Sequence, residues 1–316
     1  MLNRRLLRVK VMQALYGFFQ SENADVAKTE KGLMHSINRV YDLYLHFLIL
    51  PIEIADLAEV QMEEARNKAL PTESDLNPNR KFVDSFMIKA LRENAQLQRL
   101  VEDRKISWAS EEDRDTLKKI WKNLKASSLY ANFLESDDKP TNDRKFVEKV
   151  MTQFILDNDD VYTSFQERSI YWDYEDCDYA IHMAIRYLGK IKSETNYKTI
   201  PPMWKDEDDD ERFVKNLFRR TVSNNEENSK LIDSKTQNWE VDRIATLDVL
   251  FMKMAITEFL HFSSVPIKVT LNEYIEISKM FSTPRSKVFI NGVLDKLLSE
   301  FKKENKLKKT GRGLMQ

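Results

Sequence analysis

The sequence predicts an all-α protein, and three observations carry that prediction. Apolar residues recur at spacings of three and four over long segments, which is the period of a helix with one buried face. Only 6 of the 316 residues are glycine, whereas sheet-rich folds with tight hairpins and nucleotide folds with glycine loops need more. Prolines lie in polar stretches between the periodic segments, where they end helices. Because 42% of the residues are hydrophobic, the chain can form a sizeable core, which excludes wholesale disorder.

The predicted helices follow one another between proline-containing breaks. The first helix presents one apolar stripe, made of Leu7, Val11, Ala14, Leu15 and Phe18. Pro51 lies inside the next periodic segment, so we expect it to break or kink that helix. Further breaks are predicted near 70–80, 138–142 and 198–210, where prolines occur amid polar residues. These breaks divide the chain into an N-terminal helical part, a middle helical region and a C-terminal bundle, at 1–70, 71–205 and 206–316.

A skeleton of aromatic and amide residues recurs after each of these three breaks. In every copy a Phe-Val pair is followed by an Asn and then by a Trp, each at the same separation from the Phe. The copies are Phe82/Asn94/Trp108, Phe146/Asn158/Trp172 and Phe213/Asn225/Trp239, at nearly equal intervals along the chain. Three unrelated amphipathic helices with coincidental aromatics are the alternative. We interpret the pattern as a repeated helix-turn-helix unit, in which the Trp anchors one helix against the next.

The C-terminal region carries the clearest local signals for helix ends. Thr270 and Glu273 have the spacing of a capping box, which predicts that a helix starts at Thr270. Thr283 followed by Pro284 predicts the N-cap and the first residue of the last helix. Gly292 lies inside that last helix, where Gly costs roughly 1 kcal/mol relative to Ala. We therefore expect Gly292 to be a structural anchor that lets another backbone approach closely.

The charged residues nearly cancel in number but are distributed unevenly. The chain has 50 Lys and Arg against 51 Asp and Glu, a formal net charge of −1. Residues 1–20 carry +4 and residues 302–316 carry +5, so the stretch between them carries −10. Basic ends on an acidic body point to contact with nucleic acid or a membrane surface. No role is assigned to the C-terminal +5, for which a disordered tail with non-specific attraction is one interpretation.

Several classes of protein are disfavoured by what the sequence lacks. Cys177 is the single cysteine, so there is no disulfide framework. Residues 1–20 lack the apolar core of a signal peptide, and the apolar stretch at 45–52 is too short to span a bilayer. We therefore expect a soluble, cytoplasmic protein without membrane contact. The four histidines show no metal-ligand spacing, and the acidic runs at 173–178 and 206–211 are typical of linkers or helix N-termini. The sequence thus predicts no catalytic residues, no metal site and no cofactor.

Four C-terminal segments and the opening of the chain resemble a known family. The segments are Trp239-x-x-Asp-Arg-Ile, Ala255-Ile-Thr-Glu-Phe, the stretch from Val265 to Lys279, Phe289-Ile-Asn-Gly-Val-Leu-Asp295, and the opening from Arg4 to Tyr16. Together they are similar to the NusB family of bacterial transcription antitermination factors. The similarity covers the opening, to about position 20, and the C-terminal region from Asp209 onward. The chain therefore looks like NusB-like helical bundles with an inserted helical region, 71–205, built from repeated helix-turn-helix units.

The resemblance implies a non-enzymatic, all-α factor that acts on RNA. It implies binding of boxA-type single-stranded RNA jointly with NusE, a ribosomal protein, and support of RNA polymerase read-through, especially in ribosomal RNA operons. The expected partners are that RNA, NusE and the transcription elongation complex. The family's RNA-binding elements are its first helix and the start of its last helix. They map to Arg4, Arg5, Arg8 and Lys10, and to Arg285, Ser286, Lys287 and Phe289.

The residues themselves support this site in part. Arg4, Arg5 and Arg8 lie within about one helical turn, so one cationic edge can follow a phosphate backbone. A solvated N-terminal helix is the alternative. Two roles are open for the aromatic side chains of Tyr16, Phe18 and Phe289, namely stacking on bases and packing in the core. We expect replacement of the three arginines by Ala to abolish RNA binding without unfolding the protein.

A second hypothesis is a helical protein–protein interaction scaffold in the transcription or ribosome-assembly machinery. In this interpretation the acidic inserted region docks protein partners, and RNA binding is weak or lost. An RNA-modifying enzyme is disfavoured, because no glycine-rich cofactor loop and no catalytic Cys motif is present in the sequence.

Overall fold

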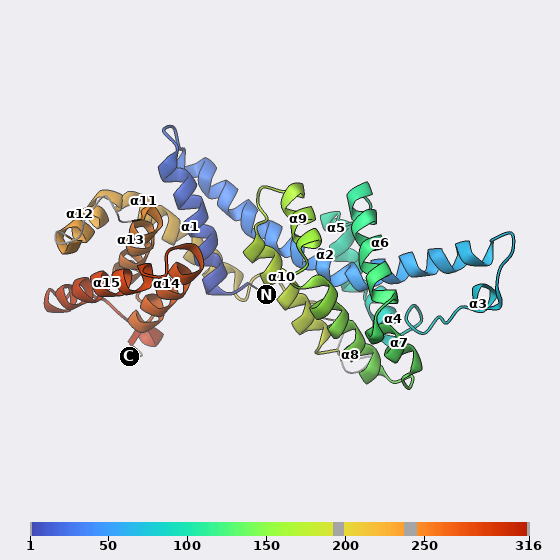
Figure 1. Cartoon of the computed structure of the whole chain (residues 1–316). Helices are drawn as coiled ribbons and strands as arrows, with labels where there is room; N and C mark the ends of the chain where they lie inside the picture. The colour runs from blue at the N-terminus through green and yellow to red at the C-terminus, as the bar shows by residue number, and fades with distance from the viewer. Residues whose placement is uncertain (1, 192–198, 237–244, 315–316) are drawn as a thin grey trace. The chain divides into compact units, whose positions relative to one another are not determined.

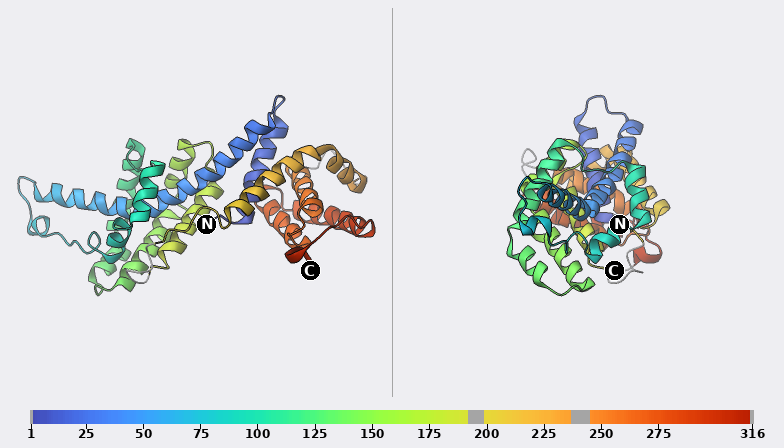
Figure 2. Two further views of the ribbon diagram at one scale, coloured as in Figure 1. Left: turned by 180° about the vertical axis from the view of Figure 1, so that it is seen from behind. Right: turned by 90° about the vertical axis from the view of Figure 1, so that its right-hand side faces the viewer.

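The chain folds into helices joined by loops, which confirms the predicted all-α class (Figure 1). The computed structural model describes residues 2–191, 199–236 and 245–314. Within these ranges the regular structure consists of α1 to α15, one π-helical segment and one 3₁₀ turn, and it includes no strand. Two further views show the same helices and their connections (Figure 2).

The helices form two compact units. Unit 1 comprises Asn38–Met203, and unit 2 comprises Leu2–Ile37 together with Trp204–Gln316. One boundary therefore falls two residues before the expected end of the middle region at 205. The other lies inside α2 (Val26–Arg66) and not near 70. The apolar period of α2 continues through this point, so the sequence carries no local sign of the boundary.

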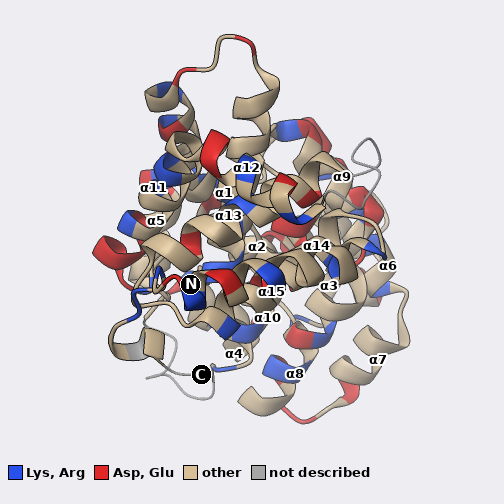
Figure 3. Cartoon of the chain, turned by 90° about the vertical axis from the view of Figure 1, so that its left-hand side faces the viewer, with Lys and Arg blue, Asp and Glu red and all other residues tan. Residues whose placement is uncertain are grey.

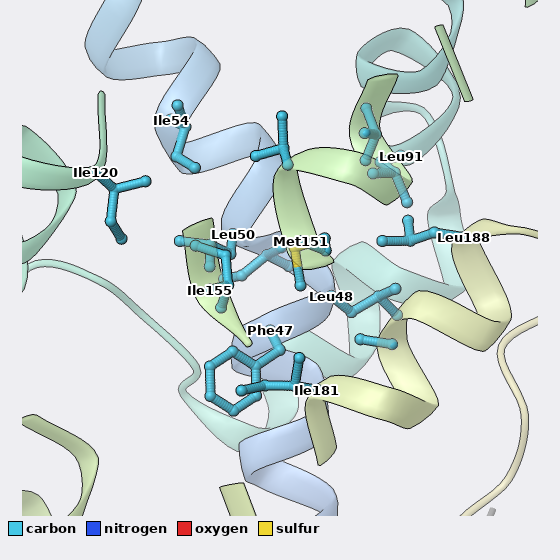
Figure 4. Packing of buried hydrophobic residues seen from close by; sticks show 14 of the residues in the cluster. Phe47, Leu48, Leu50, Ile54, Leu91, Ile120, Met151, Ile155, Ile181 and Leu188 are labelled. Atoms are coloured by element: carbon cyan, nitrogen blue, oxygen red, sulfur yellow. The ribbon is translucent and has the colours of Figure 1, made fainter. Parts of the chain in front are cut away.

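Unit 1 consists of the later part of α2 and the helices that pack around it. These are α3 (Glu73–Leu76), α4 (Phe86–Arg92), α5 (Ala95–Arg104), α6 (Glu111–Lys125), α7 (Ser128–Glu135), α8 (Pro140–Val150), the π-helical segment η1 (Met151–Ile155), α9 (Asp159–Arg168) and α10 (Tyr174–Leu188). Side chains from α2, η1 and α10 meet in the core, among them Phe47, Leu50, Met151 and Ile181 (Figure 4). Pro51 does not end α2, which continues past it to Arg66.

Two copies of the repeated skeleton have the same structural roles in unit 1. Asn94 and Asn158 are the N-caps of α5 and α9, and each side chain accepts the N–H three residues on. The buried indoles of Trp108 and Trp172 both donate to backbone carbonyls of α2, at His46 (3.1 Å) and at Arg39 (2.8 Å). Because these two acceptors are about two helical turns apart, both copies dock on one side of α2.

The third copy lies in unit 2 and is described only in part. Phe213 and Val214 are buried in α11 (Glu207–Ser223), as their counterparts are in the other copies. Asn225 begins α12 (Asn225–Thr236), at the position where the other two amides cap a helix. Trp239 falls outside the described residues, so its anchoring role stays a prediction.

Unit 2 is built around α13 (Thr246–His261), which packs against five other helices. They are α1 (Arg4–Gln20), α11, α12, α14 (Ile267–Phe281) and α15 (Ser286–Lys303), and a 3₁₀ turn at Gly311–Leu314 follows. Nearly every residue of α13 between Leu250 and Phe259 is buried. A helix that is buried on nearly all sides belongs to the centre of a bundle. The helices of unit 2 thus bring the ends of the sequence together around one central element.

Two local predictions for this region are wrong. Thr270 does not cap a helix, because α14 already begins at Ile267 with Pro266 as its N-cap. The Thr270 and Glu273 side chains instead reach other helices, as described below. The expected close approach at Gly292 is also not found, since no atom of the described residues lies within 4 Å of the Cβ position that Gly292 lacks. Gly292 is exposed on α15, so it is not a packing anchor.

The segment after α15 folds back onto the C-terminal end of α13. Lys309 Nζ donates to the carbonyl oxygens of Glu258 (3.3 Å) and Phe262 (2.9 Å). The Thr310 N–H donates to the carbonyl of Ser263 (3.0 Å). A cation at this end of a helix satisfies terminal carbonyls and opposes the helix dipole, although burial lowers the pKa of Lys309 to about 8. This part of the basic C-terminal segment is therefore packed against unit 2, which corrects its interpretation as a disordered tail.

Candidate nucleic-acid interface

The first helix begins at a well-defined cap, which positions its arginines. The Asn3 side chain accepts the N–H of Leu6 (2.8 Å), so α1 begins at Arg4. The apolar stripe of α1 is buried, and Leu7 and Leu15 are among the fully buried side chains. This packing directs the arginine side chains toward α11, α13 and α14, where each one meets carboxylates.

Arg8 is buried in an ion pair at the centre of unit 2. Its side chain is 2% exposed, and its Nε and Nη2 donate to the two oxygens of Glu258 at 2.9 and 2.6 Å. Thr270 Oγ1 (2.7 Å) and the Tyr274 hydroxyl (3.2 Å) donate to the same carboxylate. Although burial lowers the pKa of Arg8, the Glu258 carboxylate raises it above its ordinary value. Arg8 therefore faces the interior and not a phosphate backbone, contrary to the expected solvent-facing edge.

Arg4 and Arg5 are partly exposed and are also paired. Arg4 contacts Asp209 (2.7 Å) and Asp210 (2.8 Å) at the start of α11. Arg5 donates twice to Glu273 of α14, at 3.0 and 2.9 Å, and 43% of its side chain is exposed. The exposed pair of Arg4 with Asp209 is of a kind typically worth less than about 1 kcal/mol. The Asp210 carboxylate is buried, so loss of its cation is more costly. A phosphate group can therefore compete with Glu273 for Arg5 and with Asp209 for Arg4 at little cost, whereas the Asp210 pair favours the folded arrangement.

The fourth basic residue expected in this element is not on the surface. Lys10 is 2% exposed, so its side chain does not extend the edge formed by Arg4 and Arg5. The +4 charge of the opening segment is thus largely neutralised inside unit 2.

The start of α15 presents its basic residues to solvent. Arg285 and Lys287 are exposed, whereas Ser286 is buried and its hydroxyl contacts the hydroxyls of Ser282 and Thr283, both at 2.9 Å. Phe289 is half-buried. The helix begins at Ser286, two residues later than the Thr283-Pro284 pattern predicts.

Basic residues from three helices converge around one carboxylate. The pKa of Glu276 in α14 is lowered by a hydrogen bond from Lys279, and further by the charges of Lys279, Arg5 and Lys287. These cations belong to α1, α14 and α15, and all three are exposed. We call Arg5, Lys279, Arg285 and Lys287 the basic corner of unit 2. Basic and acidic positions alternate along the helices, so this corner is not part of one uniformly basic face (Figure 3).

The aromatic candidates have different surroundings. The Phe18 ring packs edge-to-face on Phe218 of α11, with the ring centroids 6.0 Å apart, which indicates a packing role. Tyr16 is 43% exposed and lines a cavity of about 370 Å³ with Phe19 of α1 and Lys253 of α13. The Lys253 amine lies 5.5 Å from the centre of the Phe19 ring. Tyr16 is therefore accessible for stacking.

The residues that sequence reasoning missed are the carboxylates and Lys279. The acidic run at 206–211 does supply the first turn of α11, as one of the two interpretations expected. Its Asp209 and Asp210 also neutralise Arg4 from the far end of the sequence. No local pattern signals such a contact. Lys279 lies in the segment that resembles the family, but the family's basic elements do not include it.

Two kinds of feature are absent from the part of the chain that the structure describes. No group of three or more His, Cys, Asp or Glu side chains is arranged to hold a metal ion there. No helix in these ranges is long and apolar enough to cross a membrane.

The fold and the basic corner define an all-α protein with a cationic surface formed by its first helix and its last two helices. Residues 198–299 match the model of the NusB family. Over 111 residues the chain is 47% identical to the transcription antitermination protein NusB of Salinibacter ruber, covering 35% of this chain and 69% of that protein. No solved structure matches the chain.

Two further relatives carry the same name. The protein from Chloroherpeton thalassium is 39% identical over 103 residues, which cover 33% of this chain and 49% of that protein. The protein from Natranaerobius thermophilus is 30% identical over 116 residues, which cover 37% of this chain and 76% of that protein. The chain belongs to the NusB family. This membership supports a role in transcription antitermination, carried by about a third of the chain.

Proposed function

We propose that this protein binds boxA-type single-stranded RNA together with NusE and supports read-through by RNA polymerase, especially in ribosomal RNA operons. In this proposal the protein acts by binding within the transcription elongation complex and catalyses no reaction. The RNA contacts are Arg4, Arg5, Arg285, Lys287 and Phe289, with Lys279 added to them.

The observation that carries the proposal is the convergence of Arg5, Lys279 and Lys287 near Glu276. Cations from separate helices that meet at one exposed corner suit a phosphate backbone, because each neutralised phosphate releases bound counterions. The exposed Tyr16 and the half-buried Phe289 supply aromatic surfaces on which unpaired bases stack. Arg8 acts indirectly, since its pair with Glu258 holds α1 against α13 and α14.

A helical interaction scaffold is the second candidate, and two observations favour it. The arginines of α1 are paired with carboxylates, which reduces the free positive charge available to RNA. Residues 38–203 hold 24 Lys and Arg against 30 Asp and Glu, so unit 1 carries a net charge of −6. Its surface also exposes Ile170 (94%) and Leu70 (90%). An acidic unit with exposed apolar side chains suits a basic protein partner better than RNA.

The discriminating experiment measures RNA affinity of the full chain with and without NusE, at about 50 and 200 mM salt. The RNA is a boxA-type single strand, and a scrambled strand of equal length is the reference. We expect NusE to tighten binding of the boxA-type strand, and Lys287→Gln to weaken it and lower the salt slope by about 1. Lys28→Gln, at an exposed lysine in the first turn of α2, is the matched control. Equal affinity for both strands, with no effect of NusE or of Lys287→Gln, would favour the scaffold.

A further inference from the structure

Several exposed cations of unit 2 lie along α15 and the segment that follows it. Arg285, Lys287, Lys296, Lys302, Lys303 and Lys308 are exposed, and none of them forms an ion pair with the described residues. The arginines of α1, in contrast, are all paired. The last helix and the segment after it therefore present exposed positive charge that no ion pair among the described residues neutralises, as do Lys28 and Lys31 of α2.

Three of these cations form a line on one side of α15. Lys296 follows Arg285 after about three full helical turns, and Lys303 follows Lys296 after about two more. From Arg285 to Lys303 the helix rises by roughly 27 Å, at about 1.5 Å per residue. We call this line the α15 stripe. A phosphate backbone laid along the helix meets a positive charge at both ends and near the middle of the stripe.

The side of α15 between these cations carries the half-buried Phe289 and two small residues. Gly292 and Ser299 lie on the same side of α15 and are exposed, and no described atom is within 4 Å of the missing Gly292 Cβ. Glu300, which is paired with Lys235, is the carboxylate nearest to this side of the helix. Asp295 is the next, and the Asn291 amide donates to it at 3.0 Å. A polymer backbone can therefore approach the helix closely at Gly292, between Phe289 and Lys296. This also accounts for a glycine in a helix that packing does not require.

The stripe is continuous with the basic corner at one end and with a held basic segment at the other. Arg285 belongs to both the corner and the stripe. At the far end, the contacts of Lys309 and Thr310 with the end of α13 hold the chain that follows α15. Lys308 is exposed beside these contacts. The cations at this end are thus carried by a packed segment.

We propose that the α15 stripe is a second contact surface for RNA, beyond the strand segment bound at the basic corner. It binds the phosphate backbone of single-stranded RNA that continues past the boxA-type element, without reading its sequence. Beyond Phe289, the stripe has no aromatic side chain and few hydrogen-bonding side chains for base edges, so contact with phosphates is the chemistry that it offers there. The inference rests on the proposed function, and it adds the path of the RNA over this protein.

The test compares two single-stranded RNAs in the presence of NusE, one limited to the boxA-type element and one extended by about ten unstructured nucleotides. With the natural protein, we expect the extended RNA to bind more tightly and with a steeper salt slope. Lys296→Gln/Lys303→Gln should abolish this gain, reduce the slope for the extended RNA by about 2 and leave the short RNA unchanged. Lys28→Gln/Lys31→Gln removes two exposed lysines of unit 2 on α2, and it should keep the gain. Circular dichroism of both variants verifies that the exposed substitutions leave the helices folded.

The outcomes separate this inference from the proposed function. If the extension gives no gain, or if the gain survives Lys296→Gln/Lys303→Gln, the stripe does not contact RNA. If both double variants lose the gain equally, the effect reflects net charge and the inference is overturned. If polyglutamate binds in a manner that depends on Lys296 and Lys303 while the extension gives no gain, the partner is an acidic protein. Failure of the short RNA to bind would refute the proposed function, whereas the effect of the extension still tests the stripe by itself.

Discussion

The buried pair of Arg8 and Glu258 should be among the largest single contributions to the stability of unit 2. We expect Arg8→Met to destabilise this unit strongly, although Met preserves much of the side-chain volume. The substitution leaves a fully buried carboxylate with only the neutral donors of Thr270 and Tyr274. Removal of one partner from a buried pair costs about 3–5 kcal/mol. Because whole domains are stable by only about 5–15 kcal/mol, the unfolded fraction should rise by roughly two to four orders of magnitude.

The assay is urea unfolding of the full chain, with hydrogen exchange of α1 and α13 as a readout specific to unit 2. Arg5→Met is the matched control, because Arg5 lies on the same helix in an exposed pair with Glu273 and should cost less than about 1 kcal/mol. The double variant Arg8→Met/Glu258→Met should be more stable than Arg8→Met, since no unpaired charge remains buried. If Arg8→Met costs no more than Arg5→Met, the pair is not a structural element and the reasoning fails. The same result would restore Arg8 as a candidate RNA contact.

Two predictions concern unit 1. Trp172→Phe removes the donor to the Arg39 carbonyl and should destabilise unit 1 by about 1–3 kcal/mol. Hydrogen exchange of residues 38–66 measures this loss. The control is Trp204→Phe, at a buried Trp of unit 2, which should leave that exchange unchanged. Equal protection in Trp172→Phe and the natural protein would contradict the anchoring role. Burial lowers the pKa of His46 to about 4. Between pH 6.5 and 4 the unfolded chain therefore binds a proton that the folded chain does not. The stability of unit 1 should fall as the pH falls through this window. Denaturant midpoints of unit 1 should show this loss in the natural protein and a smaller one in His46→Gln; parallel pH profiles would refute it.

The predictions from sequence succeeded where the signal is local. Apolar spacing and proline-containing breaks predicted the helical class, and Pro140 does begin α8. The repeated skeleton predicted comparable roles for Asn94 and Asn158, because an N-cap depends mainly on its own helix. Trp108 and Trp172 also have comparable roles, but the helix that both contact is the distant α2. Thr270 shows the limit of such reasoning. Its spacing to Glu273 matches a capping box, but the structure uses both side chains in contacts with α13 and α1.

By itself, the sequence determined that this protein is helical, where several of its helix-breaking loops lie, and that its charge is unevenly distributed. The tertiary structure decided what that charge does. Arg4, Arg5 and Arg8 meet acids that lie more than half the chain away in the sequence, so the basic first helix is neutralised by its partners. The lysines of α15 form no ion pair with the described residues, although the charge of Lys287 acts on Glu276, and they stay exposed to an external polyanion. The physical reason is that helix formation depends on neighbours along the chain, whereas the fate of a charge depends on neighbours in space, at distances where Coulomb forces act.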